Sequence, residues 1–181
     1  MFNKFLKNLK SDLKNKKKVR SSYNFLLFFL ISFSLVYLFL NIPIIYNYIN
    51  YFFGSLSNFI LNSVFGIDSK FYFLINNSII EVSSLSYPII ITNLCTGILE
   101  FSILVSAIIA TIGVSIKKKL TWVFFSTLIV IVFNIIRISL TSFIIVRFNL
   151  SFANFVHGFL FRLFLIIIVL GTYWFFLNSK K

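Results

Sequence analysis

The residues best able to do chemistry in this 181-residue chain surround its single cysteine, Cys95. Thr96 and Gly97 follow it directly, Glu100 lies one helical turn further on, and an apolar run covers residues 101–116. A thiol in the first turn of a helix meets the positive end of the helix dipole and unpaired N–H groups, which favour the nucleophilic thiolate. A lone cysteine in an apolar protein is also commonly a small packing residue. The remainder of the chain decides between these two interpretations.

Composition indicates an integral membrane protein. Hydrophobic residues make up 59% of the chain and charged residues 12%, and the mean hydropathy is +0.98, which leaves too few polar side chains for a water-exposed surface. The net charge of +13 does not indicate nucleic acid, because the basic residues gather at the ends of apolar runs. With one cysteine, one histidine and four acidic residues, the chain has little basis for a structural metal site. We expect no metal, no cofactor and no nucleic-acid partner.

Four apolar runs predict membrane-spanning helices at about residues 24–42, 94–116, 120–146 and 155–177, within a multi-pass domain that covers residues 23–181. The basic segment 1–22 predicts a cytoplasmic amino-terminal anchor. Lysine clusters at 117–119 and 180–181 predict that the second and fourth spans end inside. Both termini are therefore expected in the cytoplasm, with Cys95 at the extracytoplasmic face of the cell membrane.

The region from residue 43 to 93 is the predicted extracytoplasmic part. Residues 43–67 mix Tyr and Asn with apolar side chains, which is typical of an interfacial helix or a segment packed against other helices, and whether they also span the membrane stays open. Residues 71–75 and 79–82 flank Asn76-Asn77-Ser78 and predict a small hairpin. The expected fold is an all-α integral membrane protein of about four transmembrane helices, an interfacial helical segment and a small extracytoplasmic loop or hairpin region.

Helix geometry brings three reactive side chains to a common depth. At about 1.5 Å per residue, Cys95 and Arg137 lie roughly 33 Å and 27 Å from the lysine cluster at 117–119. His157 lies roughly 35 Å from Lys180. These three residues belong to different predicted helices, so their shared outer level makes them candidates for one site.

The arginine and the histidine also have structural interpretations. An arginine at this depth can snorkel to the headgroups, and a histidine near a helix start can be a cap or an interfacial residue. Asn134, one turn before Arg137, favours an inward and hydrogen-bonded arginine. Gly158 beside His157 allows backbone or substrate to approach closely.

Glu100 and Arg162 form a second group in the outer half of the membrane. They lie roughly 25 Å and 27 Å from the inner boundary by the same geometry. Because an isolated charge at that depth is costly, two opposite charges at one level predict a structural pair.

Three short motifs together resemble the exosortase/archaeosortase family of multi-pass membrane proteins, in the form of a compact archaeosortase-like member. They are Cys95-Thr96-Gly97-Ile98 with the following acid, Asn134-Ile135-Ile136-Arg137-Ile138, and Val156-His157-Gly158, within about residues 85–175. The resemblance implies a cysteine transpeptidase that cleaves the carboxy-terminal sorting tail of secreted proteins. It also implies transfer of the new carboxyl end to a membrane lipid or a cell-surface acceptor.

The resemblance implies a role for each residue. Cys95 attacks the scissile carbonyl to form a thioester, His157 moves the protons, and Arg137 stabilises the oxyanion or orients the peptide. Two alternatives stay open: a non-enzymatic assembly factor or transporter subunit in which Cys95 only packs, and an intramembrane cysteine protease that only hydrolyses. The sequence contains no inverted repeat that favours a transporter.

The lysine clusters generate a topology prediction. Reporters fused after Lys119 and Lys181 should respond as cytoplasmic, and a reporter near Asn77 should respond as external, because basic residues remain on the cytoplasmic side. Labelling with a membrane-impermeant reagent measures each position. A Lys119 reporter labelled from outside would place Cys95 inside and contradict the predicted orientation.

Overall fold

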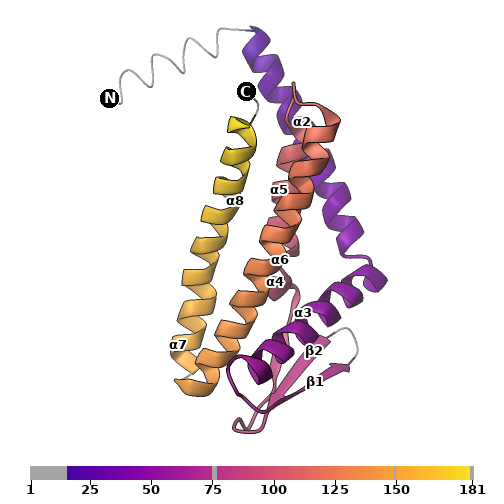
Figure 1. Cartoon of the computed structure of the whole chain (residues 1–181). Helices are drawn as coiled ribbons and strands as arrows, with labels where there is room; N and C mark the ends of the chain where they lie inside the picture. The colour runs from indigo at the N-terminus through magenta and orange to yellow at the C-terminus, as the bar shows by residue number, and fades with distance from the viewer. Residues whose placement is uncertain (1–15, 75–76, 149, 180–181) are drawn as a thin grey trace, which may run out of the picture.

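A computed structural model describes residues 16–74, 77–148 and 150–179, which form a bundle of helices with a small sheet at one end (Figure 1). Most of the predicted amino-terminal anchor and the two carboxy-terminal lysines lie outside the described residues. The helices are α2 (Lys16–Leu40), α3 (Pro43–Ser63), α4 (Asn93–Thr96), α5 (Ile98–Ala110), α6 (Ile116–Arg147), α7 (Leu150–Phe155), the π-helix η1 (Val156–Leu160) and α8 (Phe161–Asn178). The strands are β1 (Ser69–Leu74), β2 (Asn77–Val82) and β3 (Ile89–Ile91).

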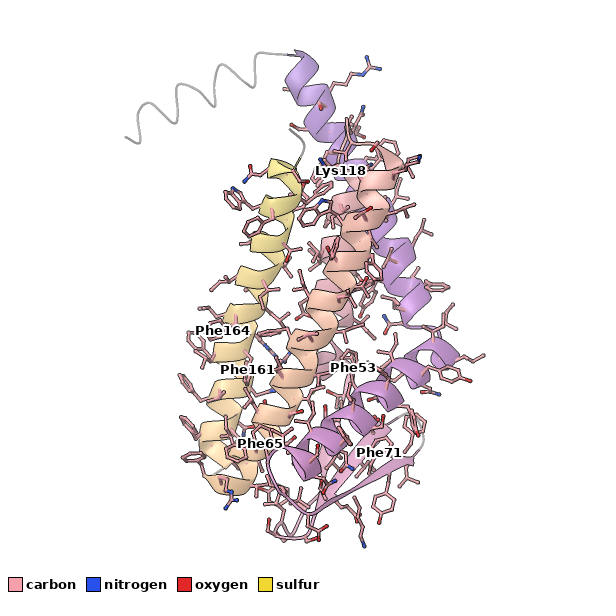
Figure 2. The ribbon with its side chains drawn as sticks, in the orientation of Figure 1. Phe53, Phe65, Phe71, Lys118, Phe161 and Phe164 are labelled. Atoms are coloured by element: carbon pink, nitrogen blue, oxygen red, sulfur yellow. The ribbon has the colours of Figure 1, made fainter. Side chains whose placement is uncertain are left out.

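Three helical segments of the described chain are long and apolar enough to cross a membrane: Val19–Leu40, Ile116–Arg147 and Leu150–Asn178. The third combines α7, η1 and α8 in one continuous rod. Three of the four predicted spans coincide with these helices, and the chain is accordingly a membrane-embedded protein. Exposed apolar side chains such as Phe164, on the outer side of α8 in Figure 2, suit a surface in contact with lipid.

The predicted span 94–116 differs in the structure. Gly97 has a φ of 70°, in the left-handed region, and it separates the four-residue α4 from α5. A right-handed helix cannot continue through that conformation, so the apolar run does not form one rod. The 13 residues of α5 extend over about 20 Å, which is less than the hydrocarbon thickness of about 30 Å. The expectation of a continuous helix over 94–116 is therefore corrected to a short helix preceded by a sharp turn.

The expected hairpin is present and carries a third strand. β1 pairs antiparallel with β2, with Lys70 opposite Glu81, and β3 pairs antiparallel with the other edge of β2. β3 ends at Ile91, one residue before the N-cap of α4. The sheet consequently delivers the chain directly to Cys95.

Helix α3 covers the sheet and joins it to α6. Buried apolar side chains from all three form one core: Phe53 and Leu61 of α3, Ile80, Val82 and Ile91 of the strands with Ile67, and Ile135 and Ile138 of α6. Figure 2 shows Phe53, Phe65 and Phe71 gathered at this end of the molecule, and Lys118 at the opposite end. A buried hydrogen bond from Ser78 Oγ to the carbonyl oxygen of Asn50, at 2.8 Å, links β2 to α3.

Gly54 sets the close approach of α3 to the sheet. A Cβ at this position would lie 2.6 Å from Phe71 Cε2 and from Ser78 Cβ. We expect Gly54→Ala to lower the free energy of unfolding by about 1–3 kcal/mol through overpacking, despite the higher helix propensity of alanine. Gly171→Ala is the matched control, because a Cβ on this helical glycine meets nothing within 4 Å. Thermal unfolding in detergent measures both variants, and equal melting temperatures would contradict the packing argument.

Candidate active site

Cys95, Arg137 and His157 meet at the end of the bundle that carries the sheet. They come from α4, α6 and η1, so each arrives on a different element. Cys95 Sγ lies 3.8 Å from His157 Nε2, and Arg137 Nη2 lies 3.3 Å from the same nitrogen. The three residues, which the sequence predicted to share only a depth, thus lie together around the imidazole of His157.

Thr141 fixes which nitrogen of His157 carries the proton. Its hydroxyl donates to the carbonyl oxygen of Arg137, at 2.7 Å, and its oxygen lies 3.3 Å from His157 Nδ1. A hydroxyl has only one proton, so the oxygen accepts a hydrogen bond from Nδ1–H. The lone pair is then on Nε2, where it faces both the thiol of Cys95 and the guanidinium of Arg137.

The side chain of Arg137 is buried inside the protein. It is 1% exposed, which excludes the snorkelling arrangement, and its Nε and Nη1 have no hydrogen-bond partner among the described residues. The contact with His157 therefore uses Nη2 and leaves Nε and Nη1 unpaired inside the described part of the protein. Buried, unpaired donors of this kind are costly and are commonly kept for function.

Local structure around Cys95 places the half-buried thiol at a corner of the chain. Thr92 Oγ1 lies 3.7 Å from Cys95 Sγ, and the Cys95 N–H donates to the Thr92 carbonyl oxygen at 2.8 Å. The stabilisation of the thiolate by a helix dipole, expected from the sequence, is small here, because α4 has only four residues. The neighbouring group that can take the thiol proton is His157.

Gly97 and Asn134 hold this corner in place. A Cβ on Gly97 would collide with the side-chain amide of Asn134, which is fully buried and donates through Nδ2 to the Val130 carbonyl oxygen at 2.8 Å. Thr96 is also buried, at 2% exposure. These three residues act on the thiol through the backbone, because they set the position of the turn that carries Cys95.

The other supporting residues lie apart from this corner. Gly158 is exposed, and a Cβ on it would meet nothing within 4 Å, so no close packing requires a glycine there. Glu100 and Arg162 line one cavity together with Arg137. Within the part of the chain that the structure describes, no salt bridge of 4.0 Å or less joins Glu100 to Arg162. The predicted ion pair is therefore not formed in the described structure, and the two residues only line the same cavity.

Sequence reasoning missed three polar neighbours of the site. Thr141 could have been found, because it lies one helical turn after Arg137 and so shares its face. Thr92 precedes the cysteine by three residues, as an N-cap residue would. Tyr46 on α3 carried no local signal; burial raises the pKa of its phenol, and the nearby Cys95 sulfur raises it further, while the hydrogen bond from Asn50 lowers it.

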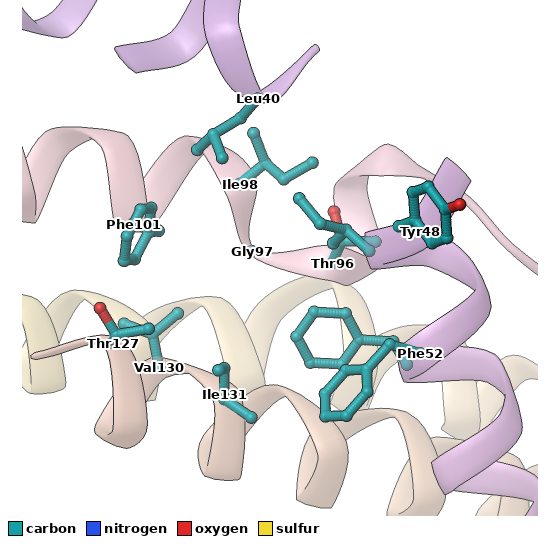
Figure 3. A pocket seen from close by; sticks show the side chains of 12 residues that line it. Leu40, Tyr48, Phe52, Thr96, Gly97, Ile98, Phe101, Thr127, Val130 and Ile131 are labelled. Atoms are coloured by element: carbon teal, nitrogen blue, oxygen red, sulfur yellow. The ribbon is translucent and has the colours of Figure 1, made fainter. Parts of the chain in front are cut away.

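An apolar cavity of about 320 Å³ adjoins the cysteine turn (Figure 3). Thr96, Gly97 and Ile98 form one wall, and α3, α6 and the end of α2 form the others. The remaining lining residues are Leu40, Tyr48, Ile49, Phe52, Phe53, Phe101, Thr127, Val130 and Ile131. The cavity is suited to apolar groups, and it reaches the cysteine turn through Thr96 and Gly97, while Cys95 itself does not line it.

The candidate site contains a thiol, an imidazole whose Nε2 lies near both that thiol and a buried guanidinium, and a positioning hydroxyl. Within residues 16–74, 77–148 and 150–179, no group of three or more His, Cys, Asp or Glu side chains could hold a metal ion. These groups can carry out nucleophilic acyl transfer with proton transfer and oxyanion stabilisation.

Comparisons with known proteins give no indication of the function of this chain. No family model, no curated protein and no solved structure matches this chain. The contacts among Cys95, Arg137, Thr141 and His157 are therefore the main indication of what the protein does.

The contact between Cys95 and His157 predicts enhanced thiol reactivity. Cys95 is the only cysteine, so alkylation by iodoacetamide reports on it alone. A free cysteine is only a few per cent thiolate at neutral pH, so we expect His157→Gln to slow alkylation by about tenfold through loss of the proton acceptor. Asn154→Gln, an exposed change one turn earlier, is the control and should leave the rate unchanged. Equal alkylation rates in both variants would contradict a functional contact.

Proposed function

We propose that this protein is a membrane-embedded cysteine transpeptidase that cleaves the carboxy-terminal sorting signal of secreted proteins and transfers the new carboxyl end to a lipid or surface acceptor. The observation that carries the proposal is the 3.8 Å contact between Cys95 Sγ and His157 Nε2, with Nδ1 held by Thr141. The motif resemblance to exosortases and archaeosortases supports the same chemistry. The helices that can cross a membrane supply the setting for a substrate that is itself anchored by an apolar tail.

In the first half-reaction, the Cys95 thiol gives its proton to His157 Nε2 and the sulfur attacks the scissile carbonyl carbon. A tetrahedral oxyanion forms and collapses as the carbon–nitrogen bond breaks. The departing amine takes the proton from Nε2. The products are a thioester on Cys95 and the released sorting tail.

In the second half-reaction, the acceptor nucleophile gives its proton to His157 Nε2 and attacks the thioester carbonyl. The carbon–sulfur bond breaks, the sulfur leaves as a thiolate, and the proton on Nε2 returns to it. Thr141 keeps Nδ1 protonated throughout, so Nε2 acts as base and acid in turn.

Arg137 changes partner during this cycle. Its Nη2 donates to the Nε2 lone pair in the resting site, at 3.3 Å. When Nε2 takes the thiol proton, that lone pair is no longer available and Nη2 is released beside the oxyanion that forms at the same moment. The donor therefore becomes available when the negative charge develops, which is where electrostatic stabilisation lowers the barrier most.

The substrate reaches the thiol from the membrane side. The apolar cavity beside Thr96 and Gly97 can take apolar side chains of the sorting tail next to the scissile bond. The lysines at 117–119 lie in the first turn of α6, at the end of the bundle opposite the sheet. By the positive-inside rule, this end of the bundle is the cytoplasmic one, together with both termini. The active site is then at the extracytoplasmic face, where a secreted protein's tail ends.

The contacts favour catalysis over a packing role for the same residues. In a non-enzymatic assembly factor or transporter subunit, Cys95 would need only apolar neighbours and Arg137 only a carboxylate. Here both contact the imidazole of His157. A protease that only hydrolyses would use the same cluster with water as acceptor, and the mass of the released product separates the two reactions.

Cys95→Ala should abolish processing of the cognate substrate at normal protein level, because alanine cannot form a thioester.

Arg137→Lys should lower turnover by about two orders of magnitude, because lysine lacks the planar fork of donors. Arg147→Lys, at the exposed end of α6, is the matched control and should process normally. Immunoblots of precursor and product measure all three variants. Normal processing by Cys95→Ala would overturn the proposed function.

A further inference from the structure

A second, polar cavity is lined by Arg137 but not by Cys95 or His157. Its volume is about 270 Å³, and it is lined by Tyr37 and Asn41 of α2, Ile98, Leu99 and Glu100 of α5, Arg137 of α6 and Arg162 of α8. The mechanism above uses only the Nη2 atom of Arg137. Two further donors of the same side chain, Nε and Nη1, therefore have no role in the proposed function.

The charges around this cavity favour an anion. Arg137 is 1% exposed, and its Nε and Nη1 have no hydrogen-bond partner in the described part of the chain, although the side chain lines the cavity. Arg162 adds a second cation, and Glu100 is the single acid in the wall. The first turn of the 13-residue α5 also contributes to the wall, and the amino-terminal end of a helix attracts negative charge. A tetrahedral oxyanion such as phosphate can satisfy two arginine side chains together.

The depth of the cavity indicates where that phosphate comes from. The candidate span of α2 ends at Leu40, and Asn41, the next residue, lines the cavity with Tyr37. Tyrosine near the end of a span is typical of the membrane–water interface, where the lipid headgroups lie. Leu99 of the cavity wall and Ile103, one turn further along α5, remain 44% and 36% exposed, so an acyl chain can lie along them.

We propose that this cavity binds the phosphate of a membrane phospholipid, with Arg137 and Arg162 as its cationic ligands. The acyl chains lie along the apolar face of α5, and the headgroup rests against the buried guanidinium that also contacts His157. The binding does not require acyl transfer, so it stands independently of the proposed transpeptidase activity. Cys95→Ala should bind the lipid as tightly as the unmodified protein.

The test is equilibrium binding to the full-length, delipidated protein in detergent by isothermal titration calorimetry. The probes are dioctanoyl phosphatidylglycerol, dioctanoylglycerol, which has the same tails without phosphate, and inorganic phosphate. We expect the phospholipid to bind at least about tenfold more tightly than either comparison probe, because only it uses both the arginines and the apolar face. Inorganic phosphate binding as tightly would show a free-anion site and overturn the lipid assignment. Dioctanoylglycerol binding as tightly would show that the phosphate is not recognised.

Three substitutions at residues other than Cys95 and His157 test whether charge holds the phospholipid in the cavity. Arg162→Gln should weaken binding of the phospholipid by about tenfold, whereas the matched control Arg147→Gln should leave it unchanged. Glu100→Gln should tighten binding, because it removes the only negative charge in the wall. Weaker binding in Glu100→Gln would show that the cavity binds a cationic group, and unchanged binding in Arg162→Gln would show that the arginines do not hold the ligand. Either result overturns the proposal.

Discussion

The imidazole of His157 is the common partner of the polar side chains at the candidate site. Its Nδ1 contacts Thr141 on α6, and its Nε2 contacts both Arg137 on α6 and Cys95 on α4. Because Arg137 is buried and Cys95, Thr141 and His157 are half-buried, their polar contacts are electrostatically stronger than the same contacts would be in water. In the proposed mechanism, the reactivity of the thiol and the hydrogen bond of the arginine both depend on the protonation state of this ring.

A steric constraint decides where the thiol meets that ring. Gly97 takes a left-handed conformation and lies against the buried amide of Asn134, so a side chain larger than hydrogen cannot occupy the position. The turn ends α4, starts α5 and leaves Cys95 directed toward α6 and η1. The sheet supports the same turn from the other side, since β3 leads into the N-cap at Thr92. The cysteine is thus positioned by backbone geometry.

Much of the membrane architecture was predictable from the sequence, because long apolar runs bounded by lysines carry a strong signal. The common depth of Cys95, Arg137 and His157 followed from helix rise alone. The break at Gly97 did not, because hydropathy continues through it and only the close approach of Asn134 reveals the constraint. A common depth does not by itself predict contact, since Glu100 and Arg162 share a cavity and form no salt bridge in the described structure.

Side-chain partners were harder to predict than positions. Thr141 belongs to the site because its single hydroxyl proton is already committed to a backbone carbonyl, a condition that no sequence pattern records. The π-helical turn at Val156–Leu160 is a similar case, because an added residue in a turn changes which side chains face the neighbouring helix. Both features depend on tertiary packing between α6 and the last span.

The central claim is that Cys95 becomes covalently acylated. Membranes containing the protein and its cognate substrate can be quenched in acid and digested, and the peptide that contains Cys95 analysed by mass spectrometry. We predict a substrate fragment joined to Cys95 through a thioester, which hydroxylamine releases as a hydroxamate. Processed substrate accompanied only by an unmodified Cys95 peptide, with no hydroxamate formed, would contradict the claim.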